Sequence, residues 1–123
     1  MNVSLYENVI KDIRKLDPNN KSIIIRSTVT PGFCNKYECS FMPEFLTEKN
    51  FENDFINCKN WIFGLRDISD PLKDKITRVI NLAYKNNKIN YNKISFVTNT
   101  EAEMIKYIRN TFLATKISYF NEI

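Results

Sequence analysis

Apolar residues recur at helical spacing near both ends of the chain. Between Tyr6 and Leu16 they fall near one face, and charged residues occupy the other side. The pattern stops at Asp17 because the residue before a proline is disfavoured in the helical region. A second helical pattern occupies the last part of the chain, through Ile105, Ile108, Phe112, Leu113, Ile117 and Phe120. We therefore expect a helix over residues 6–16 and a longer helix that closes the chain.

Between these helices lie short runs of apolar, β-branched or aromatic residues, which predict strands. The runs are Ser22–Ser27, Ser40–Met42, Trp61–Leu65 and Ile94–Val97. Pro31 and Gly32 predict a turn after the first of them. Residues 45–60 are irregular and are expected to form a loop with one helical turn, and residues 85–93 form a polar connection.

Two further helix starts are marked by capping residues. Asp70 as N-cap and Pro71 at the first helical position predict a helix that runs to about Tyr84. Thr98 or Thr100 is expected to cap the closing helix, whose first turn carries acidic residues where the helix dipole favours them.

The resulting order is helix, strand, strand, strand, helix, strand, helix. Such alternation is typical of an α/β fold with a mostly parallel sheet and flanking helices. The chain begins on a helix and ends within one that has no terminal glycine. We therefore expect both ends to be cuts through a larger fold.

Composition narrows the functional classes. The chain has 123 residues, of which 43% are hydrophobic and 26% charged, as in a single soluble domain. It has no run of about 20 apolar residues and no signal-peptide pattern, so we expect a cytoplasmic protein without a membrane partner. The net charge of +4 comes from scattered lysines rather than a basic stripe, which argues against a nucleic-acid partner.

Several kinds of catalytic site are excluded by what the sequence lacks. Without histidine there is no Ser-His-Asp triad, Cys-His pair or histidine-containing zinc site. Cys34, Cys39 and Cys58 are too few for a four-ligand zinc site, so we expect no metal and read them as buried or half-exposed reduced thiols. Two glycines cannot form a Gly-x-Gly-x-x-Gly loop or a P-loop.

Three polar stretches carry residues that suit catalysis. Arg26–Gly32 places hydroxyls after a strand end, where open α/β sheets bind ligands, although a plain strand-to-turn junction has the same pattern. Glu44 and Glu48 can act as a base and a water-orienting group, or as ordinary solvated acids. Lys106 and Asn110 share a helix face, where they suit an oxyanion or sugar hydroxyls, or form an ordinary exposed pair.

Together these stretches resemble the UDP-glucose/GDP-mannose dehydrogenase family. Ser-Thr-Val-Thr-Pro-Gly at 27–32 is similar to the family's Ser-Thr-Val-x-Pro-Gly, and Pro-Glu-Phe-Leu-Thr-Glu at 43–48 to its Pro-Glu-Phe-Leu-x-Glu. Residues 101–123 resemble its central helix, and Phe-Leu-Ala-Thr-Lys-Ile-Ser at 112–118 resembles the UDP-glucose branch. The motifs occur in the family's order over nearly the whole chain, which argues against an unrelated α/β binding domain.

The family oxidises the primary alcohol of a sugar nucleotide to a carboxylate with two NAD, so the resemblance implies NAD as cofactor. By the same resemblance, Ser27, Thr28 and Val29 lie beside the nicotinamide, and Thr28 also holds a catalytic water. Glu44 is implied as general base in hydrolysis of a thioester intermediate. Glu48 is implied to contact the cofactor, to order the site and to take part in substrate binding.

The remaining implied roles concern the sugar nucleotide. Phe45 and Leu46 line the substrate, and Glu44 is part of the same binding surface. Lys106 stabilises the oxyanion near the sugar, and Asn110 donates or accepts hydrogen bonds with the substrate. Both sit on the closing helix, so the resemblance implies a site shared between that helix and the two preceding motifs.

The chain also departs from the family pattern. It contains no Gly-rich dinucleotide loop, and none of its cysteines matches the family's nucleophilic cysteine. Cys58 and Asn60 stand where the family usually has proline and arginine. By resemblance, residues 1–100 correspond to the C-terminal part of a Rossmann-like NAD-binding domain, and residues 101–123 to the start of the central dimerisation helix.

We therefore expect a fragment of an NAD-dependent dehydrogenase that acts on UDP-glucose or a related sugar nucleotide, without turnover by the chain alone. The alternatives are a non-catalytic remnant, a subunit of a split enzyme, and a relative of the GDP-mannose branch. The expected partner is a second copy of the chain or a chain that supplies the missing domains.

Overall fold

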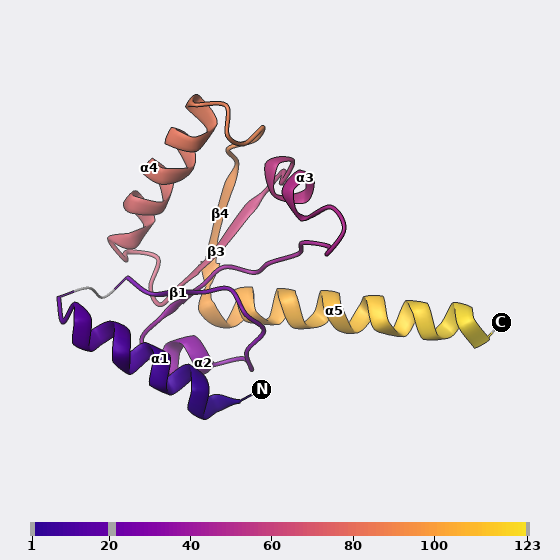
Figure 1. The fold of residues 1–123 in the computed structure, drawn as a ribbon, viewed down its shortest axis with the longest axis horizontal. Helices are drawn as coiled ribbons and strands as arrows, with labels where there is room; N and C mark the ends of the chain where they lie inside the picture. The colour runs from indigo at the N-terminus through magenta and orange to yellow at the C-terminus, as the bar shows by residue number, and fades with distance from the viewer. Residues whose placement is uncertain (1, 20–21, 123) are drawn as a thin grey trace.

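The computed structural model describes residues 2–19 and 22–122 and shows a mixed α/β fold with a long C-terminal helix (Figure 1). The elements in chain order are α1 (Val3–Leu16), β1 (Ile24–Ile25), α2 (Phe33–Lys36), β2 (Ser40–Phe41), α3 (Phe51–Ile56), β3 (Trp61–Leu65), α4 (Leu72–Lys85), β4 (Ile94–Thr98) and α5 (Asn99–Glu122). The predicted sequence of helices and strands is confirmed, with α2 as an element that the sequence pattern did not indicate.

The four strands form one sheet in the order β1-β2-β3-β4. Strands β1 and β2 are parallel, as are β3 and β4, whereas the link between the two pairs is antiparallel through Phe41 and Gly64. The longest ladder aligns Trp61–Leu65 with Ile94–Thr98. The predicted mostly parallel sheet is thus confirmed. Strand β1 is much shorter than the predicted 22–27 run, since β1 and its partner β2 pair over only two residues.

Capping explains where the helices begin. Helix α1 starts three residues earlier than predicted because the Asn2 side chain accepts a hydrogen bond from the Leu5 N–H at 3.2 Å. The Asp70 carboxylate accepts from the Leu72 N–H at 2.9 Å, as expected of a capping side chain. Helix α4 itself begins at Leu72, so Pro71 stands at the N-cap position, one residue before the helix, and not at the predicted first helical position. Thr98 and Glu101 form a reciprocal capping box at the start of α5, with distances of 3.2 and 3.0 Å.

The core consists of two apolar clusters. One joins α1, α2 and the start of α5 to the β1–β2 side of the sheet and contains Ile10, Ile25, Val29, Phe33, Cys34, Cys39, Phe41 and Ala102. The other packs α4 on the centre of the sheet and contains Trp61, Phe63, Leu65, Leu72, Ile76, Ile80 and Ile89. The three cysteines are free, with two buried in the first cluster and Cys58 half-buried, as expected from their number.

Helix α5 packs on β3 at its start and then projects away from the sheet (Figure 1). The contact is close because Gly64 has no side chain. A Cβ at this position would lie 2.8 Å from the Ala102 Cβ and 2.9 Å from the Asn99 Cα. The buried Asn99 amide also donates to the Asn35 side chain at 2.9 Å and to the Cys39 carbonyl at 2.8 Å. The first turn of α5 is therefore fixed to both β2 and β3.

Gly64→Ala is expected to lower the free energy of unfolding by about 1–3 kcal/mol, because the added methyl group meets backbone as well as side-chain atoms. Urea denaturation followed by circular dichroism measures the change. Val79→Ala, which alters a residue that is 63% exposed on α4, is the control and should change stability by less than about 0.5 kcal/mol. Equal stability of Gly64→Ala and the native chain would contradict the close packing.

Candidate functional site

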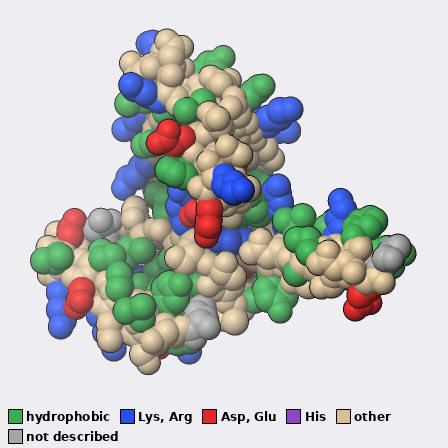
Figure 2. All heavy atoms as spheres, turned by 45° about the vertical axis from the view of Figure 1, so that its right-hand side comes forward, with side chains coloured by type: hydrophobic (Ala, Val, Ile, Leu, Met, Phe, Trp, Pro, Cys, Tyr) green, Lys and Arg blue, Asp and Glu red, His purple; other side chains and the backbone are tan. Residues whose placement is uncertain are grey.

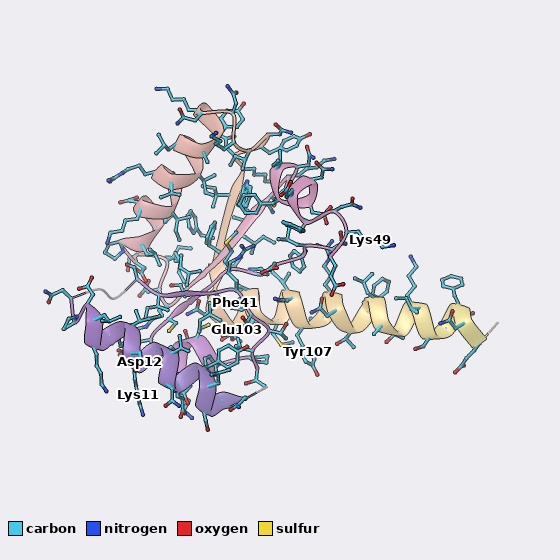
Figure 3. All side chains as sticks on the ribbon, viewed as in Figure 1. Lys11, Asp12, Phe41, Lys49, Glu103 and Tyr107 are labelled. Atoms are coloured by element: carbon cyan, nitrogen blue, oxygen red, sulfur yellow. The ribbon has the colours of Figure 1, made fainter. Side chains whose placement is uncertain are left out.

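Two buried polar side chains on α5 hold the segment that follows β1. The Lys106 ammonium, on a side chain that is 7% exposed, donates to the Arg26 carbonyl at 2.7 Å. The Glu103 carboxylate, 1% exposed, accepts from the Gly32 N–H at 2.6 Å and the Cys34 N–H at 2.9 Å. Figure 3 labels Glu103 near the start of α5, and its bond to Cys34 joins this helix to α2. Residues 26–34 are thus attached to α5 at both ends.

Local geometry explains why the chain turns here. Gly32 has a φ of 94°, a left-handed conformation that favours glycine, and this turns the chain into α2 as predicted for Pro31 and Gly32. The Glu103 carboxylate then receives backbone N–H groups at the start of that short helix. Burial, together with the neighbouring negative charge of Glu103, raises the pKa of the Cys34 thiol far above its ordinary value, so Cys34 stays a protonated core residue.

Most of the predicted site residues come together around one cavity of about 560 Å³. The cavity lies between the segment after β1, the segment after β2 and helix α5. Its lining includes seven of the residues singled out in the sequence: Ser27, Thr28, Glu44, Phe45, Leu46, Lys106 and Asn110. Segments that are up to 83 residues apart in the chain therefore form one surface, with a carboxylate, an ammonium, an amide and two hydroxyls.

Two predicted residues lie elsewhere. The Val29 side chain is 3% exposed and belongs to the apolar cluster against α1 and α2. Glu48 is exposed and does not line the cavity. The structure thus separates these two positions from the seven that share the cavity.

The charge environment of Lys106 is unusual for a lysine. Burial lowers its pKa below the ordinary value, the carboxylate of Glu44 acts in the opposite direction, and the positive charge of Arg26 lowers it further. A lysine whose ammonium is partly desolvated is a stronger acid than one in water. It is therefore better suited to donate a hydrogen bond or proton to an oxygen that gains negative charge.

The sequence pattern gave no role to two arginines that also line the cavity, Arg26 and Arg109. The Arg109 guanidinium lies over the Phe45 ring, with its central carbon 4.1 Å from the ring centroid. Arg109 follows Lys106 by three residues, and this spacing predicts that both side chains lie on one side of α5. Arg26 opens the 26–32 stretch that the sequence placed at a ligand-binding edge, but its proximity to α5 depends on the tertiary fold.

No cluster of three or more metal-ligating side chains occurs within residues 2–19 and 22–122. Over the same ranges, none of the helices combines the length and the hydropathy that a bilayer crossing requires. The Ser27 and Thr28 hydroxyls form no hydrogen bond to other described residues and are exposed at the cavity. These hydroxyls are therefore free to bind a ligand.

Glu103→Gln is expected to lower the free energy of unfolding by about 1–3 kcal/mol, because the amide offers one acceptor where two backbone N–H groups are buried. Thermal or urea denaturation measures the loss. Glu122→Gln removes the same charge from an exposed position on the same helix and serves as the control. If both variants matched the native chain, the Glu103 carboxylate would not be holding the 32–34 backbone.

The lowered pKa of Lys106 predicts a pH dependence of stability. Between the folded-state pKa and the unfolded value near 10.4, the unfolded chain binds more protons at this position, so stability rises with pH. Lys106→Met should lack this contribution. The native chain should therefore gain stability relative to Lys106→Met as the pH rises toward about 10.

Urea denaturation at several alkaline pH values measures this difference. Lys116→Met is the matched control, because it removes a lysine from an exposed position of α5. A constant difference between the native chain and Lys106→Met across this pH range would show that burial does not perturb Lys106.

Known proteins resemble this chain in both sequence and fold. Residues 100–123 match the UDP-glucose/GDP-mannose dehydrogenase family, central domain. An uncharacterised protein of Methanocaldococcus jannaschii is 34% identical over 98% of this chain and 14% of its own length. The UDP-glucose 6-dehydrogenase of Rickettsia bellii is 33% identical over 82% of this chain and 24% of its own length. The UDP-glucose 6-dehydrogenase of Campylobacter jejuni is 32% identical over 95% of this chain and 30% of its own length.

The fold resembles a solved structure over nearly its whole length. A ternary complex of GDP-mannose dehydrogenase from Pseudomonas aeruginosa superposes with a TM-score of 0.77, at 23% identity, over 99% of this chain and 30% of that one. The chain spans from 14% to 30% of the length of these relatives. By its motifs, its relatives and its fold, this chain belongs to the UDP-glucose/GDP-mannose dehydrogenase family.

Proposed function

We propose that this chain forms the sugar-binding and acid–base part of the active site of an NAD-dependent sugar-nucleotide 6-dehydrogenase, with UDP-glucose as the favoured substrate. One observation carries the proposal: residues of three separate family motifs line a single cavity of about 560 Å³. The sequence identity to UDP-glucose 6-dehydrogenases supports this choice of substrate. The alternative substrate is the sugar nucleotide of the GDP-mannose branch.

The cavity offers a division of roles. Lys106 is placed to stabilise the oxygen that becomes negative when the sugar carbon is attacked, since its ammonium is held at the cavity by the Arg26 carbonyl. Asn110, one helical turn further along, is placed to hydrogen-bond sugar hydroxyls. Phe45 and Leu46 supply apolar surface for the sugar ring, and the cavity volume lies in the range of small-molecule sites.

Hydrolysis of an acyl intermediate needs a water and a base. In this proposal the Thr28 hydroxyl holds the water, and Glu44 accepts its proton as the water oxygen bonds to the carbonyl carbon of the thioester. The carbon–sulfur bond then breaks, and the sulfur leaves as the thiolate of a cysteine that is not one of these 123 residues. Glu44 is exposed and lines the same cavity as Thr28, so both groups face one space. The carboxylate of Glu44 raises the pKa of Lys106, which supports the placement of the proposed acid and base near each other.

The cofactor would supply the acceptor for the hydride that the sugar alcohol loses. Ser27 and Thr28 would contact it from this chain, because their hydroxyls are exposed at the cavity and form no hydrogen bond with other described residues. The Val29 backbone and Glu48 complete the proposed cofactor contacts. We propose that the remainder of the cofactor is bound by residues other than these 123.

The projecting part of α5 supports a proposed partner. Its residues from Tyr107 onward are exposed, and they include several large apolar side chains, namely Ile108, Phe112, Leu113, Ile117, Tyr119 and Phe120. Figure 2 shows apolar side chains spread along this projecting helix. Monomeric proteins rarely leave so large an apolar surface uncovered. We propose that a second copy, or a chain with the remaining domains, covers it.

A ¹⁵N–¹H correlation spectrum titrated with UDP-glucose tests the proposal. The expected result is shifts in the amides of residues 44–48 and 106–110, with little change on α4. Asn110→Ala should weaken binding by about three- to tenfold, because it removes hydrogen bonds to the sugar. Asn8→Ala, an exposed asparagine on α1, is the matched control.

A parallel titration with GDP-mannose assigns the branch. Tighter binding of UDP-glucose supports the favoured substrate, whereas tighter binding of GDP-mannose supports the alternative. An unresponsive spectrum with both nucleotides, or shifts remote from the cavity, would overturn the proposed site.

A further inference from the structure

A second cavity lies next to the one described above and shares a wall with it. This cavity, of about 610 Å³, extends from the segment after β2 toward α3 and β3. The residues that line both cavities are Arg26, Phe45, Leu46, Thr47 and Arg109. A ligand that fills both spaces must therefore pass the two arginines. Each space alone has the volume of a typical small-molecule site.

Neither arginine forms an ion pair with a described residue. Within residues 2–19 and 22–122 the only ion pair joins Arg66 and Glu38, at 3.7 Å. The Arg26 Nε is buried and finds no hydrogen-bond acceptor in the described part of the chain. An unsatisfied buried N–H is costly, and an acceptor supplied by a ligand would remove this cost. The Arg109 guanidinium is held over the Phe45 ring, which limits its freedom before binding.

The charge balance at the shared wall favours an anion. The first cavity carries Arg26, Lys106 and Arg109 against the single carboxylate of Glu44. In the second cavity the acid is Asp54, whose carboxylate already accepts from the Thr47 N–H at 2.9 Å and its hydroxyl at 2.7 Å. Figure 2 shows Lys and Arg side chains where α5 leaves the sheet. Two unpaired guanidinium groups remain available at the junction.

We propose that Arg26 and Arg109 form a diphosphate-binding pair at the wall between the two cavities. The inference rests on the proposed function, because it assigns the diphosphate of the nucleotide to this wall and the sugar to the first cavity. Guanidinium groups bind phosphate oxygens through paired N–H donors, which suits the unpartnered Arg26 Nε. The diphosphate belongs either to the sugar nucleotide or to the dinucleotide cofactor, and both offer the same anionic group.

Inorganic pyrophosphate is the direct probe, and isothermal titration of the full chain measures its affinity. Arg109→Gln and Arg26→Gln should each weaken binding by roughly tenfold, the loss expected for charge-assisted hydrogen bonds. Lys116→Gln removes the same charge from α5 at a position that lines neither cavity, and should leave the affinity unchanged. Arg109→Lys keeps the charge and should lose part of the affinity, because the fork geometry is gone.

Arg109 is exposed, so its substitution is not expected to disturb folding, and it carries the test if Arg26→Gln unfolds. Equal losses in Arg109→Gln and Lys116→Gln would indicate non-specific attraction and overturn the inference. Unchanged affinity in a folded Arg109→Gln protein would overturn it as well.

Competition experiments identify the source of the diphosphate. Displacement of pyrophosphate by UDP-glucose assigns the pair to the sugar nucleotide, and displacement by NAD alone assigns it to the cofactor. Displacement by neither overturns the inference. If UDP-glucose shifts residues 106–110 and Arg109→Gln binds pyrophosphate normally, the inference fails and the proposed function stands. If Arg109 controls pyrophosphate and NAD binding but UDP-glucose shifts nothing, the inference stands and the proposed function fails.

Discussion

The contact between Gly64 and the first turn of α5 determines where the rest of the candidate site lies. An added Cβ at Gly64 would come within 3.0 Å of both Ala102 and Asn99, so the helix rests directly on the central strand. From this position Glu103 reaches the backbone at Gly32, and Lys106, less than one turn later, reaches Arg26. A small displacement of the helix would therefore move both attachments of the 26–34 segment at once.

Hydrogen bonds from α5 side chains to backbone groups compensate for weak pairing between β1 and β2. Strands β1 and β2 contain two residues each, so their ladder supplies few hydrogen bonds. The α5 side chains of Asn99, Glu103 and Lys106 are buried, and each bonds main-chain atoms of the segments that flank these strands. Such bonds are strong when water is excluded. The helix thus specifies the path of the segments that line the candidate site, independently of their own side chains.

Features with local causes were predictable from the sequence. The bounds of β3, the Asp70 cap of α4 and the Thr98 cap of α5 follow from neighbouring residues alone. Helix α2 was missed because it depends on the left-handed Gly32 and on a carboxylate about 70 residues away. Family motifs indicated most of the residues that share the cavity. The sequence did not predict that Arg26 and Arg109 line the same cavity wall, because the two residues are far apart in the chain. The motif also did not predict that the Val29 side chain faces the core.

Helix α5 changes character along its length, and the candidate site lies at the change. Its first turns are fixed by burial, whereas every described residue from Tyr107 onward is exposed. Helices gain most of their stability from tertiary packing, so the projecting part depends on whatever covers its apolar side chains. Arg109, Asn110 and Leu113 belong to this part and also line the cavity. A partner that covered the projecting helix would therefore also stabilise one wall of the candidate site, and assembly would then be coupled to the proposed ligand binding.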